Sequence, residues 1–323
     1  MVTEFAAFVV IILSAGIAAG TPILYGALGE IFAERSGILN LGVEGMMLVG
    51  ALTGIVAGLA TGSAVMGALA AMAAGGLLSL IHAFISITLR GDQVVSGLAL
   101  TIFGAGLSAF LGFPYVNVPA PKFSALPIPV LESVPFVGPI FFQHDATVYL
   151  AFVLLPISWF WINKTRPGLH LRAVGENPAA ADALGVNVTV IRYVYTVVGG
   201  ALCGLGGAAL SLAYTPGWIE NMTAGWGWIA VGLVIFAAWN PWRAAFGAYL
   251  FGAISRVVFD VQMLPTAGLP QLVKVLLTPE ILRMMPYAAV ILILIFASRE
   301  AVRRRVGAPA ALGRAYTREE AEA

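Results

Sequence analysis

Two polar side chains in a mostly apolar stretch are the first candidates for chemistry. Asn40 and Glu44 stand four residues apart in the run 38–60, so a helix through this run would place both on one face. A carboxylate among apolar groups is costly and normally faces a cavity or a partner group. Two roles are therefore predicted. Asn40 and Glu44 line the path of a polar solute, or they form a buried polar pair that fixes helix packing.

Two tryptophans and an aspartate form the second set of candidates. Trp226 and Trp228 open another apolar run, 225–238, near an expected outer face. Tryptophan is enriched where a helix meets the membrane surface. An interfacial belt and a stacking surface for a ring-shaped or sugar-like solute are both open roles. Asp92 precedes the run 94–113 and is predicted to cap that helix.

Catalysis finds no support in the residue pattern. The sequence has no Gly-Lys-Ser/Thr phosphate loop, so nucleotide binding of that kind is not expected. His82, His144 and His170 are scattered, with no cysteine or carboxylate at metal-ligand spacing. The chain is predicted to be neither an enzyme nor a metal protein, and no cofactor is expected.

The polar segment 163–192 separates two long apolar blocks. It is rich in charged residues, although only 10% of the chain is charged. Asn177 followed by Pro178 is typical of a helix start, and Gly185 of a helix end. A short helix over 178–184 is therefore predicted to lie at a membrane surface and to dock onto a partner in the water.

These residues must be positioned by membrane-spanning helices. The chain has 323 residues, of which 60% are hydrophobic, and its repeated apolar runs are long enough to cross a hydrocarbon core of about 30 Å. Glycines in the run 193–214 favour close helix packing. We expect an all-α polytopic transmembrane bundle of about eight to ten spans. The runs are 5–28, 38–60, 64–89, 94–113, 148–162, 193–214, 225–238, 244–261 and 286–297.

Basic residues in the loops predict the orientation. With 163–192 in the cytoplasm, most loop Lys and Arg residues lie on the same side, and only Lys122, Lys274 and Arg283 lie outside. Cytoplasmic loops carry an excess of such residues. The N-terminus is therefore predicted to lie outside and the C-terminus in the cytoplasm.

Two further regions flank the spans. The outer loop 114–147 contains many prolines, so no long helix can run through it. It is predicted to be a stiff linker or an ordered cap that receives an external partner. Residues 1–298 are the predicted transmembrane domain, and the basic tail 299–323 is expected to be a solvated anchor at the cytoplasmic surface.

Three blocks of the sequence resemble a known family. The runs GEIFAERSGILNLGVEGMM (29–47), GDQVVSGLAL (91–100) and LRAVGENPAAADALGV (171–186) are similar to motifs of ABC importer permeases of the nucleoside and simple-sugar type. This group belongs to the superfamily of the branched-chain amino acid and ribose permeases, and the last block resembles its cytoplasmic coupling segment. The chain departs from the family at Trp239 and Trp242, in a turn where relatives usually place glycine.

The resemblance implies partners and coupling residues. The chain would pair with a paralogous second permease subunit, two copies of an ABC ATPase and an extracytoplasmic substrate-binding protein, in a bacterial cytoplasmic (inner) membrane. The helix 178–184 would sit in a groove of the ATPase and transmit its closure. The implied coupling residues are Gly175, Glu176, Asn177, Pro178, Ala180, Ala181, Asp182 and Gly185.

We therefore expect a permease that moves a small polar solute inward by alternating access, driven by ATP hydrolysis in a partner chain. The resemblance favours a nucleoside or a related base or sugar. Three alternatives stay open: a permease of the same superfamily for simple sugars or branched-chain amino acids, an ion-driven secondary transporter, and a membrane scaffold. The net charge of +1 argues against nucleic acid as a partner, whereas contact with membrane lipid is expected.

Overall fold

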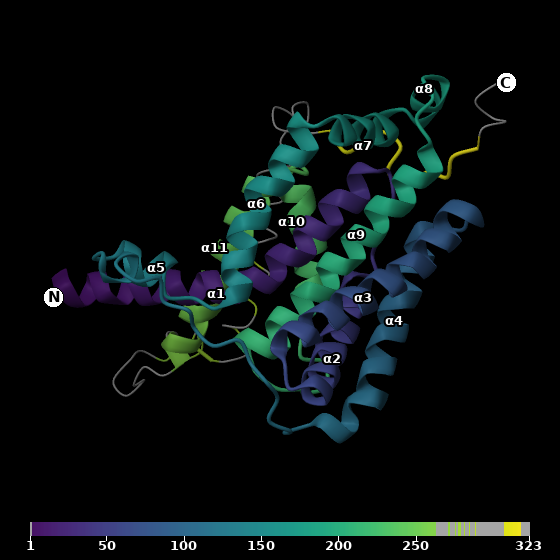
Figure 1. The fold of residues 1–323 in the computed structure, drawn as a ribbon. Coiled ribbons are helices and arrows are strands. Elements are labelled where there is room, and N and C mark those ends of the chain that lie inside the picture. Colours follow the sequence, from purple (N-terminus) through teal and green to yellow (C-terminus); the bar gives the residue numbers. More distant parts are fainter. Residues whose placement is uncertain are drawn as a thin grey trace.

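The computed structural model describes residues 2–262 and 307–317, with a few positions between 271 and 288. Over these residues the chain folds into a helical bundle (Figure 1), which confirms the all-α prediction. The helices are α1 (Val2–Arg35), α2 (Val43–Thr61), α3 (Ala64–Ala83), α4 (Gln93–Gly112), α5 (Val137–Phe141), α6 (Ala146–Lys164), α7 (Arg166–Glu176), α8 (Pro178–Ala183), α9 (Val188–Ala209), α10 (Trp226–Ala237) and α11 (Pro241–Gln262). Single π-helical turns at Phe84–Thr88 and Leu210–Tyr214 extend α3 and α9, and 3-10 turns lie at Phe113–Tyr115 and Leu131–Ser133.

The predicted spans coincide with helices. In the described part of the chain, 6 helices are long and apolar enough to cross a membrane, and they correspond to the runs between 5 and 214. The runs 225–238 and 244–261 correspond to α10 and α11. The predicted span 286–297 falls, apart from Ala288, outside the described residues.

Small residues bring the central helices close together. A Cβ on Gly199 of α9 would lie 2.6 Å from the carbonyl oxygen of Gly29 in α1. A Cβ on Gly50 of α2 would lie 2.5 Å from the carbonyl oxygen of Gly204 in α9. Such distances leave no room for a larger side chain. The predicted packing role of the glycines in the sixth run is confirmed.

Capping side chains mark several helix starts. Asp92 accepts the backbone N–H of Val95 at 2.9 Å, and Asn187 accepts that of Val190 at 3.0 Å. Each cap satisfies one of the free donors in a first helical turn. The prediction that Asp92 caps the helix after it is confirmed.

The Pro-rich loop 114–147 folds back onto the bundle. The N–H of Phe123 donates to the carbonyl oxygen of Leu212 at 2.8 Å, and Val116 pairs with Trp218 in an isolated bridge. Trp218 is only 1% exposed. The loop is thus ordered and packed against the end of α9, while the binding of an external partner stays a prediction.

One helix is too short to span the bundle, and another starts inside it. α10 has 12 residues, about 18 Å at 1.5 Å per residue, which is less than a hydrocarbon core of about 30 Å. It ends beside the end of α1, where Arg35 Nη2 donates to the carbonyl oxygen of Trp239 at 3.4 Å. α2 begins next to Gly26, about 13 Å before α1 ends. Residues 36–42, between α1 and α2, therefore form a break inside the bundle.

Candidate functional site: a coupling surface and a buried helix break

The segment predicted to dock folds into two short helices, α7 and α8. The side chain of Asn177 accepts the N–H of Ala180 at 3.0 Å, and Pro178 occupies the first turn of α8. Gly185 follows α8 with φ +81°, a left-handed conformation that glycine adopts without strain. The predicted start and stop of this helix are confirmed.

The predicted coupling residues differ in exposure. Glu176, Asn177, Ala180 and Gly185 are exposed, Pro178 and Asp182 are half-buried, and Gly175 and Ala181 are buried. Gly175 is buried because α7 approaches α1 so closely that a Cβ there would lie 2.1 Å from the carbonyl oxygen of Arg35. Ala181 packs in a cluster with Val174 and Val188. The exposed residues are available to a partner, whereas the buried ones hold the shape of the surface, and coupling itself stays a prediction.

Leu184 projects from the end of α8 and is 86% exposed. Single exposed leucines are ordinary on protein surfaces, but this one stands at the tip of the predicted docking helix. Leu169, on α7, is 55% exposed. Neither leucine stands out in the sequence, because one more leucine in an apolar-rich chain carries no signal.

Residues 307–317 lie against α7 and α8 (Figure 1). The N–H of Ala311 donates to the carbonyl oxygen of Gly175 at 2.9 Å, and the Tyr316 hydroxyl donates to Asp182 Oδ2 at 3.1 Å. Ala311 is only 5% exposed. The backbone of the tail thus pairs with a carbonyl at the end of α7 that has no helical partner. Gly307, Ala308 and Arg314 are nevertheless exposed, and the role of the tail as a solvated anchor stays a prediction.

A buried arginine joins the tail to α9. Arg192, which the sequence analysis placed in the polar segment, lies near the start of α9 and is 1% exposed. Its Nη1 donates to the carbonyl oxygen of Arg314 at 3.1 Å. A Cβ on Gly37, at the start of the break, would lie 3.0 Å from its Nη2. The tail, α9 and the break thus meet around one guanidinium group.

Side chains hold the middle of the break. The N–H of Leu39 donates to Gln93 Oε1 at 2.8 Å, and its carbonyl oxygen lies 3.0 Å from His82 Nε2. Because a carbonyl can only accept, Nε2 carries the proton, and Nδ1 accepts the Ser96 hydroxyl at 3.0 Å. His82 is thus a structural histidine between α3, α4 and the break, a role that the sequence did not indicate.

Two further side chains complete this support. The N–H of Asn40 donates to Glu30 Oε1 at 2.9 Å, and the Thr101 hydroxyl donates to the carbonyl oxygen of Leu41 at 2.8 Å. Lipid offers no partners for backbone groups, so an irregular segment at membrane depth must be buried in protein. Side chains from α1, α3 and α4 replace the helical hydrogen bonds that the chain gives up here.

Asn40 and Glu44 do not share a helix face. α2 begins at Val43, so Asn40 precedes the helix. The Asn40 Oδ1 accepts the N–H of Gly42 at 3.0 Å, and its Nδ2 lies 3.6 Å from the sulfur of Met46. The prediction of a common face is wrong because it assumed a helix through the whole run. A place for either side chain on a solute path stays a prediction.

Glu44 binds the first turn of α10. Its Oε1 accepts the Thr223 hydroxyl at 2.6 Å and the N–H of Gly225 at 2.8 Å, and its Oε2 accepts the N–H of Gly227 at 2.6 Å. Glu44 is 5% exposed. A helix start carries free N–H donors and a partial positive charge, and a carboxylate matches both. α2 and α10 therefore share one buried starting point, with α10 rather than Asn40 as the partner of Glu44.

Trp226 and Trp228 open α10, next to the contact between Glu44 and the N–H of Gly227. Their place in an interfacial belt near the outer face stays a prediction. The ring of Trp226 lies 5.5 Å from that of Tyr214, and Trp228 is 40% exposed. Stacking of either indole on a solute stays a prediction.

The other end of α10 is tied to α1. The Trp239 indole N–H donates to the carboxylate of Glu34, and Trp239 is 4% exposed. Ala238 and Trp239 have φ values of 57° and 54°, which are uncommon for residues other than glycine. The residue at which the chain departs from the family pattern is thus a buried anchor for α10.

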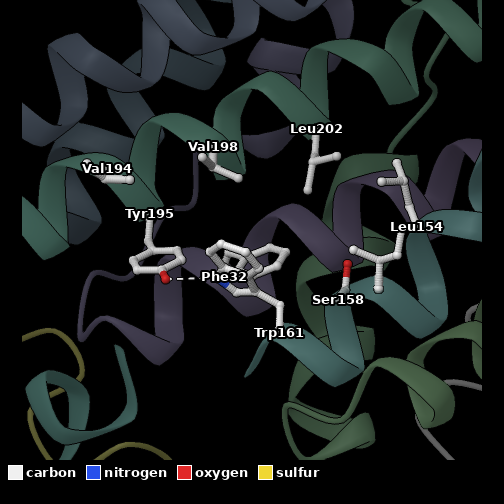
Figure 2. A pocket seen from close by; sticks show the side chains of 9 residues that line it. Phe32, Leu154, Ser158, Trp161, Val194, Tyr195, Val198 and Leu202 are labelled. Carbon is white, nitrogen blue, oxygen red and sulfur yellow. Dashed lines mark hydrogen bonds between the residues drawn. The ribbon is translucent and has the colours of Figure 1, made fainter. Parts of the chain in front are cut away.

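An apolar cavity of ≈ 280 Å³ lies between α1, α6 and α9 (Figure 2). Its lining residues are Phe32, Leu154, Ile157, Ser158, Trp161, Val194, Tyr195, Val198 and Leu202. The Trp161 indole donates to the Tyr195 hydroxyl at 2.9 Å, as the dashed line in Figure 2 shows, so the indole donor is already used. A polar solute would find few partners here, and we do not assign this cavity to one.

The chain is similar in sequence to known permease proteins. The chain matches the family described as "Branched-chain amino acid transport system / permease component" over residues 12–294. The putative glucose ABC transporter permease protein TsgC13 of Haloferax volcanii is 42% identical over 95% of this chain and 98% of its own length. The guanosine ABC transporter permease protein NupQ of Bacillus subtilis is 37% identical over 84% of this chain and 89% of its own.

A second guanosine ABC transporter permease protein of Bacillus subtilis, NupP, is 28% identical over 58% of this chain and 56% of its own length. Two guanosine permease proteins of one bacterium thus resemble this chain. No solved structure matches the chain significantly.

Proposed function

Because the chain belongs to the family of permease components described for branched-chain amino acid transport, we propose that it is the membrane-spanning subunit of an ABC importer for a nucleoside or a simple sugar. One observation carries the proposal. The capped helix α8 projects Leu184 from the end of the bundle, in a chain whose relatives are named ABC transporter permeases. An exposed apolar side chain at the end of a short helix can bind a pocket of a separate ATPase, which would then move the helix.

A nucleoside is the solute that we favour, with glucose as the competing candidate. Relatives that cover most of this chain are named for guanosine and for glucose. Both compounds carry a hydroxylated sugar ring, so the two names agree on that part of the solute. Guanosine differs from glucose by its base, so a test should compare uptake of these two compounds.

The proposed mechanism is alternating access driven from α8. ATP hydrolysis in the partner ATPase would push on α8, which rests on α9 through Ala181 and Val188. α7 rests on the end of α1 at Gly175, and α1 leads directly into the break. In transporters, helices that start inside the membrane often surround the solute site. Movement of the break would shift the shared start of α2 and α10 at Glu44 and open the path to one side and then the other.

The proposed assembly contains two different permease chains, two ATPase subunits and an extracytoplasmic binding protein in a cytoplasmic membrane. The resemblance of this chain to both guanosine permeases of one bacterium supports a paralogous pair. We place α7, α8 and the C-terminus in the cytoplasm, on the side of the ATPase, and the N-terminus outside.

Reconstitution of the complete complex in liposomes tests this function. With ATP available to the ATPase subunits, uptake of radiolabelled guanosine is expected to require ATP and the binding protein, and unlabelled guanosine should compete while glucose does not. ATP-dependent uptake of glucose without uptake of guanosine would show that the solute is a sugar and not a nucleoside. Guanosine uptake by this chain alone, driven by a proton or sodium gradient, would replace the ABC importer by a secondary transporter.

A further inference from the structure

Residues 307–317 touch both the coupling helices and the helix break. We propose that this segment, here called the strap, is a working part of the importer: it ties α8 to the break, so that a push on α8 moves the start of α2. The proposal rests on the proposed function, because it assumes an ATPase that acts on α8. It adds a task for a tail segment that neither the family match nor the names of relatives describe.

The strap contacts α7 through Ala310 and Ala311 and α8 through Tyr316. The N–H of Ala311 donates to the carbonyl oxygen of Gly175 at 2.9 Å, and the N–H of Ala310 lies 3.4 Å from Glu176 Oε2. Tyr316 packs against the cluster that contains Ala181, and its hydroxyl donates to Asp182 at 3.1 Å. α8 is only 6 residues long, too short to be stable alone, so contacts of this kind set its position.

The strap also holds the break. The N–H of Gly313 donates to the carbonyl oxygen of Gly37 at 3.2 Å, and the carbonyl oxygen of Arg314 accepts from buried Arg192. Gly37 has φ +92°, and a Cβ there would lie 3.3 Å from the carbonyl oxygen of Ala311. The backbone of the strap thus lies directly on the first turn after α1, at a position that is fitted for glycine.

The contacts of the strap with α7 and with the break are separated by few residues. Ala311 binds α7 and Gly313 binds the break. Because so few residues join the two contacts, a shift of α7 and α8 would also move the break. From Gly37 the chain continues through the side-chain contacts of Leu39 and Asn40 to Glu44. A strap that only anchored the tail would need just one of these two contacts.

Truncation of the purified importer complex tests the strap. We compare the full chain, a chain ending at Val306 and a control chain ending at Thr317, and measure basal ATPase activity and its stimulation by guanosine-loaded binding protein. The chain ending at Val306 is expected to lose stimulation by about two- to thirtyfold, the range measured for residues that modulate coupling between sites, with basal ATPase and assembly retained. The chain ending at Thr317 should behave like the full chain. Full stimulation without the strap would overturn the proposal.

A milder pair of changes keeps the test open if the shortened chain fails to assemble. Tyr316→Phe and Asp182→Asn each weaken the contact between strap and α8, and the double variant should reduce stimulation no further than the stronger single variant. Hydrogen exchange at the amides of Leu39 and Asn40 should rise in Tyr316→Phe if the contact reaches the break. Additive losses, or unchanged exchange, would contradict the strap. Absence of any stimulation in the full-length complex would instead count against the proposed function.

Discussion

The coupling surface and the helix break are built in opposite ways. α8 is defined by its own sequence, with a cap at Asn177 and a stop at Gly185, and Ala180 and Ala183 are exposed. The middle of the break, at Leu39, is held by residues that are distant in the sequence. Its backbone is bound by His82, Gln93 and other side chains from distant helices. The comparison teaches that the start and the end of α8 are set by residues close to it in the sequence, while the part that would open and close depends on the whole bundle.

This contrast predicts that changes at buried starts and breaks lower stability, whereas changes at the coupling surface act on transport. The variants below are ordered by their expected effect on the free energy of unfolding. A coupling-surface variant that unfolds the bundle, or a buried variant that leaves it unaffected, would break the comparison.

The largest effect is expected for Glu44→Ala. This change removes the acceptor of three donors at the buried start of α10, and each orphaned buried group costs ~1–3 kcal/mol. We expect a loss of at least about 3 kcal/mol, seen as poor recovery of folded protein in detergent and a lower thermal midpoint. Glu176→Ala, at an exposed carboxylate, is the matched control and should unfold like the unchanged chain.

Gln93→Leu should have the next largest effect. Leucine has no hydrogen-bond acceptor, so it leaves the N–H of Leu39, now bound at 2.8 Å, without this partner. An unsatisfied buried N–H costs ~1–3 kcal/mol. Thermal unfolding and hydrogen exchange at Leu39 measure the result. If Gln93→Leu were as stable as the unchanged chain, with no faster exchange, the break would not depend on this side chain.

Asn177→Ala tests the coupling surface, where a smaller effect on stability is expected. Loss of a helix N-cap costs ~1 kcal/mol, but the affected helix has 6 residues and lies on the surface. We expect α8 amides, beginning with Ala180, to exchange faster, with little change in the thermal midpoint of the bundle. Asn177→Ser, which keeps a capping oxygen, should restore protection. Equal exchange in Asn177→Ala and Asn177→Ser would show that the cap is not needed.

Leu184→Ser should have the smallest effect on stability, within about 0.5 kcal/mol, because the side chain is exposed. If Leu184 enters a pocket of the ATPase, the variant will nevertheless lose ATP-driven uptake. Leu169→Ser, at an exposed leucine on α7, provides the control. Equal losses of uptake in both variants would contradict a specific contact between Leu184 and the ATPase.

The sequence was sufficient where partners are near in the chain. The cap at Asp92, the start at Asn177 and the stop at Gly185 involve residues within one helical turn, and all were predicted correctly. The long apolar runs likewise predicted the spanning helices, because length and hydropathy are properties of a single segment.

Predictions failed where partners are remote. The donors of Glu44 come from residues 179 to 183 positions later, and no local pattern indicates them. Asn40 and Glu44 were placed on one face because the break was not foreseen. Likewise, no local pattern indicates the carbonyl groups on α7 and at Gly37 that the tail segment 307–317 binds.

The contact between Glu44 and α10 also bears on how the chain is made. A growing polypeptide of this kind emerges at roughly 5–20 residues per second, and Gly227 follows Glu44 by 183 residues. For roughly 10–40 s the carboxylate therefore has none of its final donors, although α2 is already available for insertion. We expect this carboxylate to stay hydrated until α10 is made, so that chains stopped before Thr223 are degraded faster in pulse-chase than chains stopped after Gln262.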